Sequence, residues 1–424
     1  MNRIDELIVE HCPDGVTFNE LGKCAAYSDT RIDASELDET NFVGVDNLLQ
    51  NAAGKTDASY PPNTARLTAY EVGDILLGNI RPYLKKIWLA NDSGGCSGDV
   101  LAIRVTEAYR PELMPEFLYR LLASDVFFAY NMQHAKGAKM PRGSKEAILK
   151  YRIPVPPLVV QREIVKVLDT FTQLEAELEA ELEARRRQYQ YYREALLTFG
   201  ERTDADASKQ ASKQASKQAS KQASKQASIA TLGEIGSFMR GTGIQKSDFT
   251  ETGVGCIHYG QIHTHYGTWA DETLSFVSPE FAARLRKAHT GDLVIATTSE
   301  DDEAVAKAVA WLGDEDVAVS TDAYIFRHTL NPKYVSYFFQ TDFFQSQKKP
   351  HITGTKVCRI SGESLAKVRI PVPSDEEQER IVAILDRFDT MVNDISIGLP
   401  AEIKARRQQY EHYRDRLLTF REAA

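Results

Sequence analysis

Cysteine is scarce in this sequence, and the few that occur form no recognisable set. The 424 residues contain five, Cys12, Cys24, Cys96, Cys256 and Cys358, which are scattered and show no CxxC spacing. This pattern argues against a disulfide framework and a structural zinc site, and it is typical of reduced thiols in the cytoplasm. No apolar run approaches the roughly 20 residues of a membrane span, so no membrane association is expected. The opening residues mix charges early, so no signal peptide is expected either.

The signatures of several enzyme classes are also missing. The sequence has no GxxxxGK[ST] phosphate loop and no HExxH pair, so neither ATP hydrolysis nor zinc hydrolysis is expected. The Asn/Asp-Pro-Pro-aromatic loop of adenine methyltransferases is approached only at Tyr60–Asn63, in reversed order, and at Asn331–Tyr334. The second segment lacks one proline and lies where a helix should begin, so capping explains it better. We predict no catalytic residue.

Three histidines lie close together in the second half of the chain, at His258, His263 and His265. They could form a metal site, but no nearby cysteine or carboxylate completes a tetrahedral set. Loop histidines that contact backbone or DNA explain them better, so we predict no metal.

The formal net charge of −9 argues against a general nucleic-acid coat protein, but it leaves room for a specific binder with local basic patches. Basic residues are concentrated in two places, each just before an R-I-P-V-P sequence. These basic residues are Lys136, Lys139, Arg142, Lys145 and Lys150 in the first half, and Lys348, Lys349, Lys356, Arg359 and Lys367 in the second.

A long segment that occurs twice is the main feature of the chain. The copies span 151–199 and 368–420, and each begins with R-I-P-V-P and continues with apolar residues three or four apart. This spacing predicts a helix of roughly 35–40 residues in each copy, near 55 Å long at about 1.5 Å per residue. Such a helix cannot bury its apolar stripe against itself, so the two copies should pair. A coiled coil that only holds the chain together is the simpler interpretation of the helices alone.

Each long segment follows a module of mixed character. In the first module, 71–80 predicts a turn and a strand, 100–105 a strand, and 115–130 a helix. The same order recurs in the second half, where Gly291-Asp292 matches Gly73-Asp74 and 332–344 matches the helix. Between the halves, repeats of ASKQ lack large apolar residues and predict a solvated linker. We therefore expect an α+β protein with modules at 1–150 and 229–367, helices at 151–200 and 368–424, and a linker at 201–228.

Each copy of the long segment contains close variants of two motifs, Q-R-E-I-V-x-x-L-D-x-F and Q-x-Y-x-Y-Y-R-x-x-L-L-T-F. This combination resembles the specificity subunits of type I restriction–modification systems. The resemblance covers nearly the whole chain. It implies two target recognition domains that each read half of a bipartite double-stranded DNA site, and two helices packed antiparallel with pseudo-two-fold symmetry. It also implies two adenine methyltransferase subunits and two restriction/translocase subunits as partners. No cofactor is then expected on this chain, since S-adenosylmethionine, ATP and Mg would be bound by the partners.

Candidate DNA contacts fall in matching loops of the two modules. A K-x-x-R spacing beside a glycine suits phosphate or guanine contacts, although a solvated charged loop has the same composition, and some of the tyrosines equally suit a core. In the first module the candidates are Asn79, Arg81, Tyr83, Lys85, Lys136, Lys139 and Arg142. In the second they are Lys246, Tyr259, Gln261, Tyr266, Thr298, Ser299, Lys348, Lys356 and Arg359.

The helix ends carry more tyrosine than a simple helix pair needs. We therefore predict that Tyr189, Tyr192, Tyr410 and Tyr413 bind the partner subunits, because aromatic side chains anchor interfaces. The alternative function, from another class, is a coiled-coil adaptor that pairs two protein-binding modules. Salt-sensitive binding to split DNA sites would distinguish the two.

Overall fold

The computed structural model describes residues 3–199 and 227–423, which form two compact units. Unit 1 comprises Met1–Glu179 and Ile403–Ala424, and unit 2 comprises Ala180–Glu402. The predicted ASKQ linker lies almost entirely outside the described residues. No helix in the described part of the chain is long and apolar enough to cross a membrane.

Unit 1 contains two four-stranded sheets and a short ribbon. The first sheet has the order β2 (Ala25–Tyr27), β9 (Val100–Val105), β6 (Ile75–Gly78), β7 (Ile87–Leu89). The second has the order β3 (Arg31–Asp33), β5 (Arg66–Tyr70), β8 (Gly94–Cys96), β4 (Phe42–Val43). The ribbon pairs β1 (Phe18–Glu20) with β10 (Arg152–Pro154), which is the first R-I-P-V-P segment. The helices of this part are α1 (Arg3–His11), α2 (Leu21–Cys24), α3 (Pro115–Leu122), α4 (Asp125–Gln133) and α5 (Lys145–Lys150).

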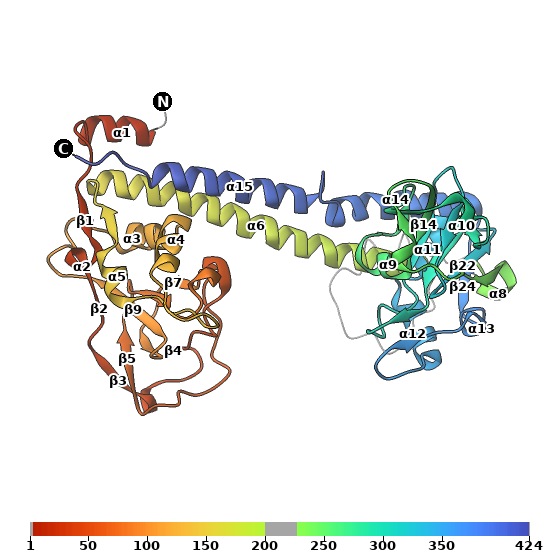
Figure 1. The fold of residues 1–424 in the computed structure, drawn as a ribbon, viewed down its shortest axis with the longest axis horizontal. Helices are drawn as coiled ribbons and strands as arrows, with labels where there is room; N and C mark the ends of the chain where they lie inside the picture. The colour runs from red at the N-terminus through yellow and green to blue at the C-terminus, as the bar shows by residue number, and fades with distance from the viewer. Residues whose placement is uncertain (1–2, 200–226, 424) are drawn as a thin grey trace. The chain divides into compact units, whose positions relative to one another are not determined.

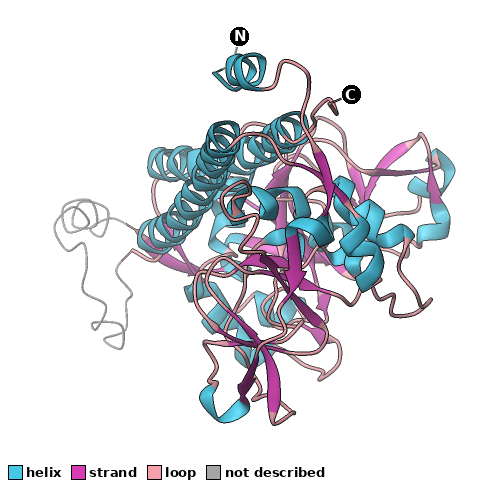
Figure 2. Cartoon of the chain, turned by 90° about the vertical axis from the view of Figure 1, so that its left-hand side faces the viewer, coloured by secondary structure: helices cyan, strands magenta, loops and turns pink. Residues whose placement is uncertain are grey.

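Unit 2 repeats this plan with additional strands. Its first sheet has the order β12 (Gly236–Arg240), β22 (Ala323–His328), β18 (Leu293–Ala296), β20 (Ala308–Trp311), β15 (Trp269–Ala270). Its second has the order β13 (Phe249–Thr250), β16 (Ser275–Val277), β14 (Val254–Ile257), β21 (Val317–Val319), β17 (Lys287–Ala288). A ribbon pairs β11 (Ser228–Thr231) with β24 (Arg369–Val372), the second R-I-P-V-P segment. The four strands from β12 to β20 match β2, β9, β6 and β7. Helices and strands are mixed within each unit, so the predicted α+β class is confirmed (Figure 2).

The Gly-Asp turn has the same structural role in both units. Asp74 is buried and accepts two hydrogen bonds from Arg104 of β9, at 2.8 and 2.7 Å. Asp292 is also buried and accepts from Arg327 of β22, at 2.9 Å. A buried carboxylate is stable only when a partner satisfies it, so the turn and the neighbouring strand are fixed together.

The helices predicted at 115–130 and 332–344 are each two helices, so those predictions were wrong in continuity. The first divides into α3 and α4, and the second into α11 (Pro332–Phe338) and α12 (Asp342–Lys348). Ser124 and Thr341 stand at the two breaks, and each side-chain oxygen accepts the N–H three residues later. This is the N-cap geometry that starts a new helix.

The long helix predicted in the first repeat is α6 (Leu158–Leu197), with 40 residues. The second repeat was wrongly predicted as one helix, because it divides into α14 (Asp375–Asn393) and α15 (Leu399–Leu417). The cause is local. Asp394 accepts the backbone N–H groups of Ser396 and Ile397 in a turn, and Pro400 has no N–H for the helical ladder.

The long helices pair within each unit. In unit 1, Phe171 of α6 stacks on Tyr413 of α15 at 5.4 Å between ring centroids, and Glu175 pairs with Arg407 (Figure 1). The later residue of α6 meets the earlier residue of α15, so this pair is antiparallel. In unit 2, Tyr192 of α6 stacks on Phe388 of α14 at 5.3 Å.

A buried glutamine fixes each helix start to its module. Gln161 donates to the carbonyls of Pro156 and Glu112 and accepts the backbone N–H of Met114. Gln378 donates to the carbonyl of Pro373 and accepts the backbone N–H of Asn331. Both side chains are buried, and both belong to the Q-R-E-I-V type of segment identified in the sequence. We call this pair of contacts the glutamine clamp.

Candidate nucleic-acid interface

In the first module, the segment after β6 lies against a hairpin formed by Lys136–Arg142. The ends of the hairpin exchange backbone hydrogen bonds, from Lys136 to Arg142 and back, at 2.9 Å each. Arg81 donates its backbone N–H to Pro141, and Gly143 donates to Asn79, at 2.7 and 3.0 Å. The structure therefore brings together two stretches that lie about 60 positions apart in the sequence and that were predicted separately.

The exposed cations of this hairpin are Lys136, Lys139 and Arg142. Arg142 also pairs with Asp99 at 3.2 Å while remaining more than half exposed. A tight turn presents these side chains, because Gly137 has a φ of +100°, a conformation that side chains rarely adopt. Positive charge on a protruding turn suits contacts with phosphate or with guanine.

The segment 79–85, which follows β6 and bonds to the hairpin, contains two strained residues. Arg81 and Lys85 have φ values of 51° and 50°, in the left-handed region, and they flank the short helix η3 (Pro82–Leu84). Non-glycine residues in this region cost of order 1–3 kcal/mol and cluster at binding sites. Arg81 and Tyr83 of this segment are exposed to solvent.

Two first-module candidates face inward. Asn79 is buried, and its side-chain oxygen has no hydrogen-bond partner in the described ranges 3–199 and 227–423. Lys85 forms an ion pair with Asp125, which also binds Arg414. Partial burial acts to raise the pKa of Asp125, but the hydrogen bonds from Lys85 and Arg414 lower it below its usual value. Asn79 and Lys85 therefore support the interface from within.

The second module has the same arrangement. The hairpin Thr353–Arg359 closes with backbone hydrogen bonds of 2.8 and 2.9 Å, and Gly354 has a φ of +89°. Here the pairing with the segment after β18 is a true ladder, between β19 (Thr298–Ser299) and β23 (Cys358–Arg359). Lys356 and Arg359 are exposed, in the positions of Lys139 and Arg142.

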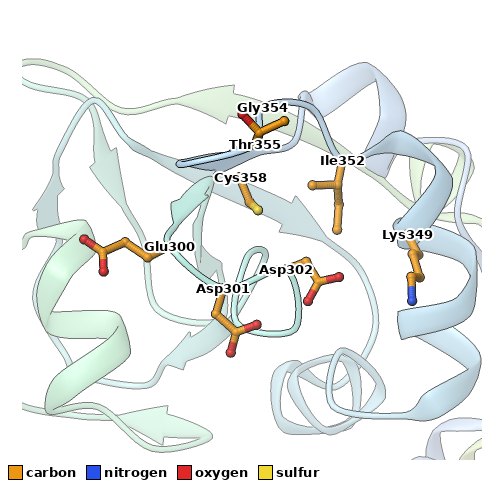
Figure 3. Close-up of a pocket in the computed structure, with 8 residues that line it drawn as sticks. All are labelled: Glu300, Asp301, Asp302, Lys349, Ile352, Gly354, Thr355 and Cys358. Atoms are coloured by element: carbon orange, nitrogen blue, oxygen red, sulfur yellow. The ribbon is translucent and has the colours of Figure 1, made fainter.

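The second module differs in charge. An open cleft of about 610 Å³ separates the acidic stretch Glu300–Asp302 from the hairpin side, where Lys349, Ile352, Gly354, Thr355 and Cys358 lie. Figure 3 shows Asp301 and Asp302 across this cleft from Ile352 and Lys349. The matching part of the first module, 82–84, has no acidic residue and lies between the cations Arg81 and Lys85, so the two modules differ in charge along this segment.

The histidine-rich segment forms α9 (Tyr259–Thr264), which lies beside this interface. His263 contacts the carbonyl oxygen of Thr298 at 3.0 Å. Gln261 caps the helix and donates to Ser275, so its amide is already engaged. Tyr266 is buried, and its hydroxyl accepts the N–H of Leu274. Within the described residues, no group of three or more His, Cys, Asp or Glu side chains is arranged to hold a metal ion.

The remaining second-module candidates divide by exposure. Lys246 is exposed, and Tyr259 and Ser299 are half-buried. Thr298 is buried within the β19–β23 ladder. Lys348 is also buried, at 1% exposure, and its ammonium is bonded to backbone, so it does not face a ligand. The methyltransferase-like Asn331 caps α11 through the N–H groups of Lys333 and Tyr334, as the sequence predicted.

Comparison with known proteins agrees with this geometry. The family model of the type I restriction modification DNA specificity domain matches residues 101–184 and 227–405, which is well over half of the chain. The chain belongs to this family. In the type I specificity family, the chain is similar to the specificity subunit of the type I restriction enzyme EcoR124I/EcoR124II of Escherichia coli, with 33% identity over 63% of each chain. It is also similar to a putative type I specificity subunit of Haemophilus influenzae, with 28% identity over 73% of this chain and 74% of that one.

The match to the Escherichia coli relative thus spans somewhat less than two thirds of that protein's length. A solved structure concerned with assembly and conformational transition of the type I R-M system matches 96% of this chain and 98% of its own, at 21% identity and a TM-score of 0.61. The type I specificity fold, with two sheet-rich domains and long helices, is therefore confirmed for this chain.

The tyrosines predicted to bind partners contact their own unit in this specificity-family fold. Tyr189 is 5% exposed and its hydroxyl donates to Asp389 at 3.2 Å, while Tyr192 stacks on Phe388. Tyr410 accepts from Arg120, and Tyr413 stacks on Phe171. Tyr192, Tyr410 and Tyr413 keep part of their surface exposed, and partner binding by all four tyrosines stays a prediction.

Proposed function

We propose that this chain is the DNA-specificity subunit of a type I restriction–modification complex, in which each module reads one half of a bipartite target. The observation that carries the proposal is the duplicated interface: a strained or laddered segment and a basic hairpin, present in both modules. Two separate DNA-binding interfaces on one chain suit a target that consists of two half-sites. The exposed cations supply affinity through the phosphates, and the neighbouring polar residues supply the choice of base.

In this proposal the chain has no catalytic role. Two adenine methyltransferase subunits and two restriction/translocase subunits would bind it in the cytoplasm, and they would bring S-adenosylmethionine, ATP and Mg. The five described cysteines are free and buried, which suits a reducing compartment. Membership of the specificity family supports DNA recognition as the task of this chain.

The test begins with the target. Sequencing of methylated adenines in a host that expresses the complete system should give one bipartite motif, and purified complex should protect that motif in a footprint. Binding should weaken steeply as salt rises, because phosphate contacts release counterions. An adaptor of two protein-binding modules would show neither a bipartite motif nor a salt-dependent footprint.

A further inference from the structure

One position supports the interface in both modules. The segments 115–156 and 332–373 align without a gap, and this alignment places Lys348 where the first module has Asn131. Both side chains are 1% exposed, near the carboxyl ends of α4 and α12, just before the hairpins. A buried polar side chain needs hydrogen-bond partners, so these partners show which segment of the chain it fixes in place.

Lys348 holds the acidic stretch of the cleft. Its ammonium Nζ donates to the carbonyl oxygens of Glu303 and Val305, at 2.7 Å each, and lies 5.9 Å from the ring centroid of Phe344. The two carbonyls belong to the far end of Glu300–Val305, whose first residues line the cleft. The ammonium carries three donors and no acceptor, so two backbone oxygens and a ring face suit it well.

Main-chain hydrogen bonds also hold the far end of the acidic stretch, from the N–H of Val305 to the carbonyl of Asp301 at 3.2 Å and from the N–H of Ala306 to the carbonyl of Ala296 at 2.9 Å. At its start, Asp301 accepts the N–H of Glu303 within the loop itself. At its end, Ala306 has a φ of +67°, in the left-handed region that side chains disfavour. The bonds from Lys348 are the side-chain contacts that hold the chain just before this strained residue, and together with the main-chain bonds they fix the path of the loop.

In the first module the corresponding side chain lacks such bonds. Neither the amide nitrogen nor the oxygen of Asn131 has a hydrogen-bond partner among the residues that the structure describes. A Cβ atom added to Gly143 would lie 2.5 Å from the Asn131 oxygen, so the amide is packed against the base of the hairpin. The site is therefore common to both modules, but only the second uses a charge there.

We propose that Lys348 is a positioning residue for the second module: it holds Glu300–Val305 where the carboxylates meet base edges, without touching DNA itself. This inference rests on the proposed function. Carboxylates are repelled by phosphate but accept hydrogen bonds from the amino groups of cytosine and adenine in the major groove. Carboxylates that contact base edges must be held at a fixed distance from the bases, and the buried Lys348 fixes the main chain that carries them.

The test compares full-length variants in the assembled complex on the motif found by methylation mapping. The measured quantity is the ratio of Kd for DNA with a scrambled half-site to Kd for the intact site, taken separately for each half-site. Lys348→Met removes the donors at similar volume and should lower the second ratio about tenfold or more, the scale of two lost charge-assisted bonds, while leaving the first ratio unchanged. The matched control is Lys307→Met, which removes another partly buried lysine whose ammonium donates to the carbonyl of Tyr266, at 3.0 Å. It should leave both ratios within about twofold of wild type.

A pH profile separates positioning from simple packing. Burial lowers the pKa of Lys348 to about 8, against the attraction of Asp302, Asp301, Glu303 and Cys358. As pH rises from about 7 to 9.5, the lysine loses its charge and the second ratio should fall, while the first stays constant. In Lys348→Arg, which stays charged throughout, the second ratio should stay constant too.

Several results would overturn the inference. These are an unchanged second ratio in folded Lys348→Met, an equal fall of both ratios, or a second ratio in wild type that does not change with pH. If Lys348→Met fails to fold, the wild-type profile and Lys348→Arg still decide. If wild type shows no bipartite target at all, the proposed function fails instead, before any variant is compared.

Discussion

The second module should lose stability in weak acid because a histidine with buried ring nitrogens ends an interior strand of its first sheet. His328 is the last residue of β22, and burial lowers its pKa to about 4, against the attraction of Asp292 and a contact with the backbone of Leu330. Neither ring nitrogen makes a hydrogen bond of normal geometry within the described part of the chain. The matching position in β9 of the first module is Val105, which cannot titrate.

The sign and size follow from the two pKa values. An unfolded histidine binds a proton near pH 6.5, but the folded one does not do so until about pH 4. Between these values the unfolded state takes up more protons, so the free energy of unfolding falls as pH falls. The loss should be about 2 kcal/mol at pH 5 and about 3 kcal/mol at pH 4, from about 1.4 kcal/mol for each pH unit.

Hydrogen exchange of the full-length chain can measure this loss, after correction for the intrinsic exchange rate. Peptides from β18 and β22 report on the second module, and peptides from β6 and β9 report on the first. His328→Val installs the residue of the first module, so it should change the opening free energy by no more than about 1 kcal/mol at pH 7, where the histidine is mostly neutral in both states. At pH 5 the variant should be about 2 kcal/mol more stable, relative to wild type, than it is at pH 7. Parallel pH curves for wild type and variant would refute the reasoning.

Four further predictions concern recognition and assembly. Lys139→Ala with Arg142→Ala should weaken binding by about 1 kcal/mol or more at the first half-site only. The control Arg110→Ala removes an exposed arginine of the same module that pairs with Glu107, and it should not weaken binding. Equal loss of binding at both half-sites in a binding scan would contradict this prediction. Tyr192→Glu with Tyr413→Glu should release the methyltransferase subunits on co-purification, and the matched double Phe variant should retain them; retention by the Glu variant would contradict a partner role. The first long helix contains a four-residue LEAE repeat that starts at Leu174 and again at Leu178. Insertion of one further LEAE unit lengthens α6 by about 6 Å and should widen the gap between half-sites by one or two base pairs in a methylation map. Deletion of one ASKQ unit should leave the gap unchanged, and a shifted gap there would show that the linker sets a distance.

The architecture was predictable because the chain repeats it. Apolar spacing located α6, and the strands β6 and β9 fall where the turn and the β-branched run placed them. The errors are breaks in helices. Ser124 and Thr341 were visible as caps, and Pro400 was visible in the second repeat, but periodicity was given more weight than these local signals.

The interface was predicted only in part. The K-x-x-R spacing located both hairpins, because a glycine and two cations in a polar stretch mark an exposed turn. Burial was not predictable from residue type, since Lys348 and Lys356 are both lysines in one basic run. Only tertiary packing decides that Lys348 turns inward to backbone carbonyls and Lys356 outward to solvent. Comparison of the halves gave a signal that was overlooked: Lys348 aligns with an asparagine, not with a second cation.

The glutamine clamp has a consequence for how such a protein can diversify. Each glutamine accepts a main-chain N–H from its module, at Met114 or Asn331, and donates to main-chain carbonyls. Main-chain groups are the same whatever the side chain, so these contacts place almost no demand on the sequence of the module that they hold. The module can therefore vary in sequence while this part of the joint to the long helix stays intact. Variation is limited where side chains of the module also meet the helix, as Arg120 does at Asp169 and Lys333 at Asp386.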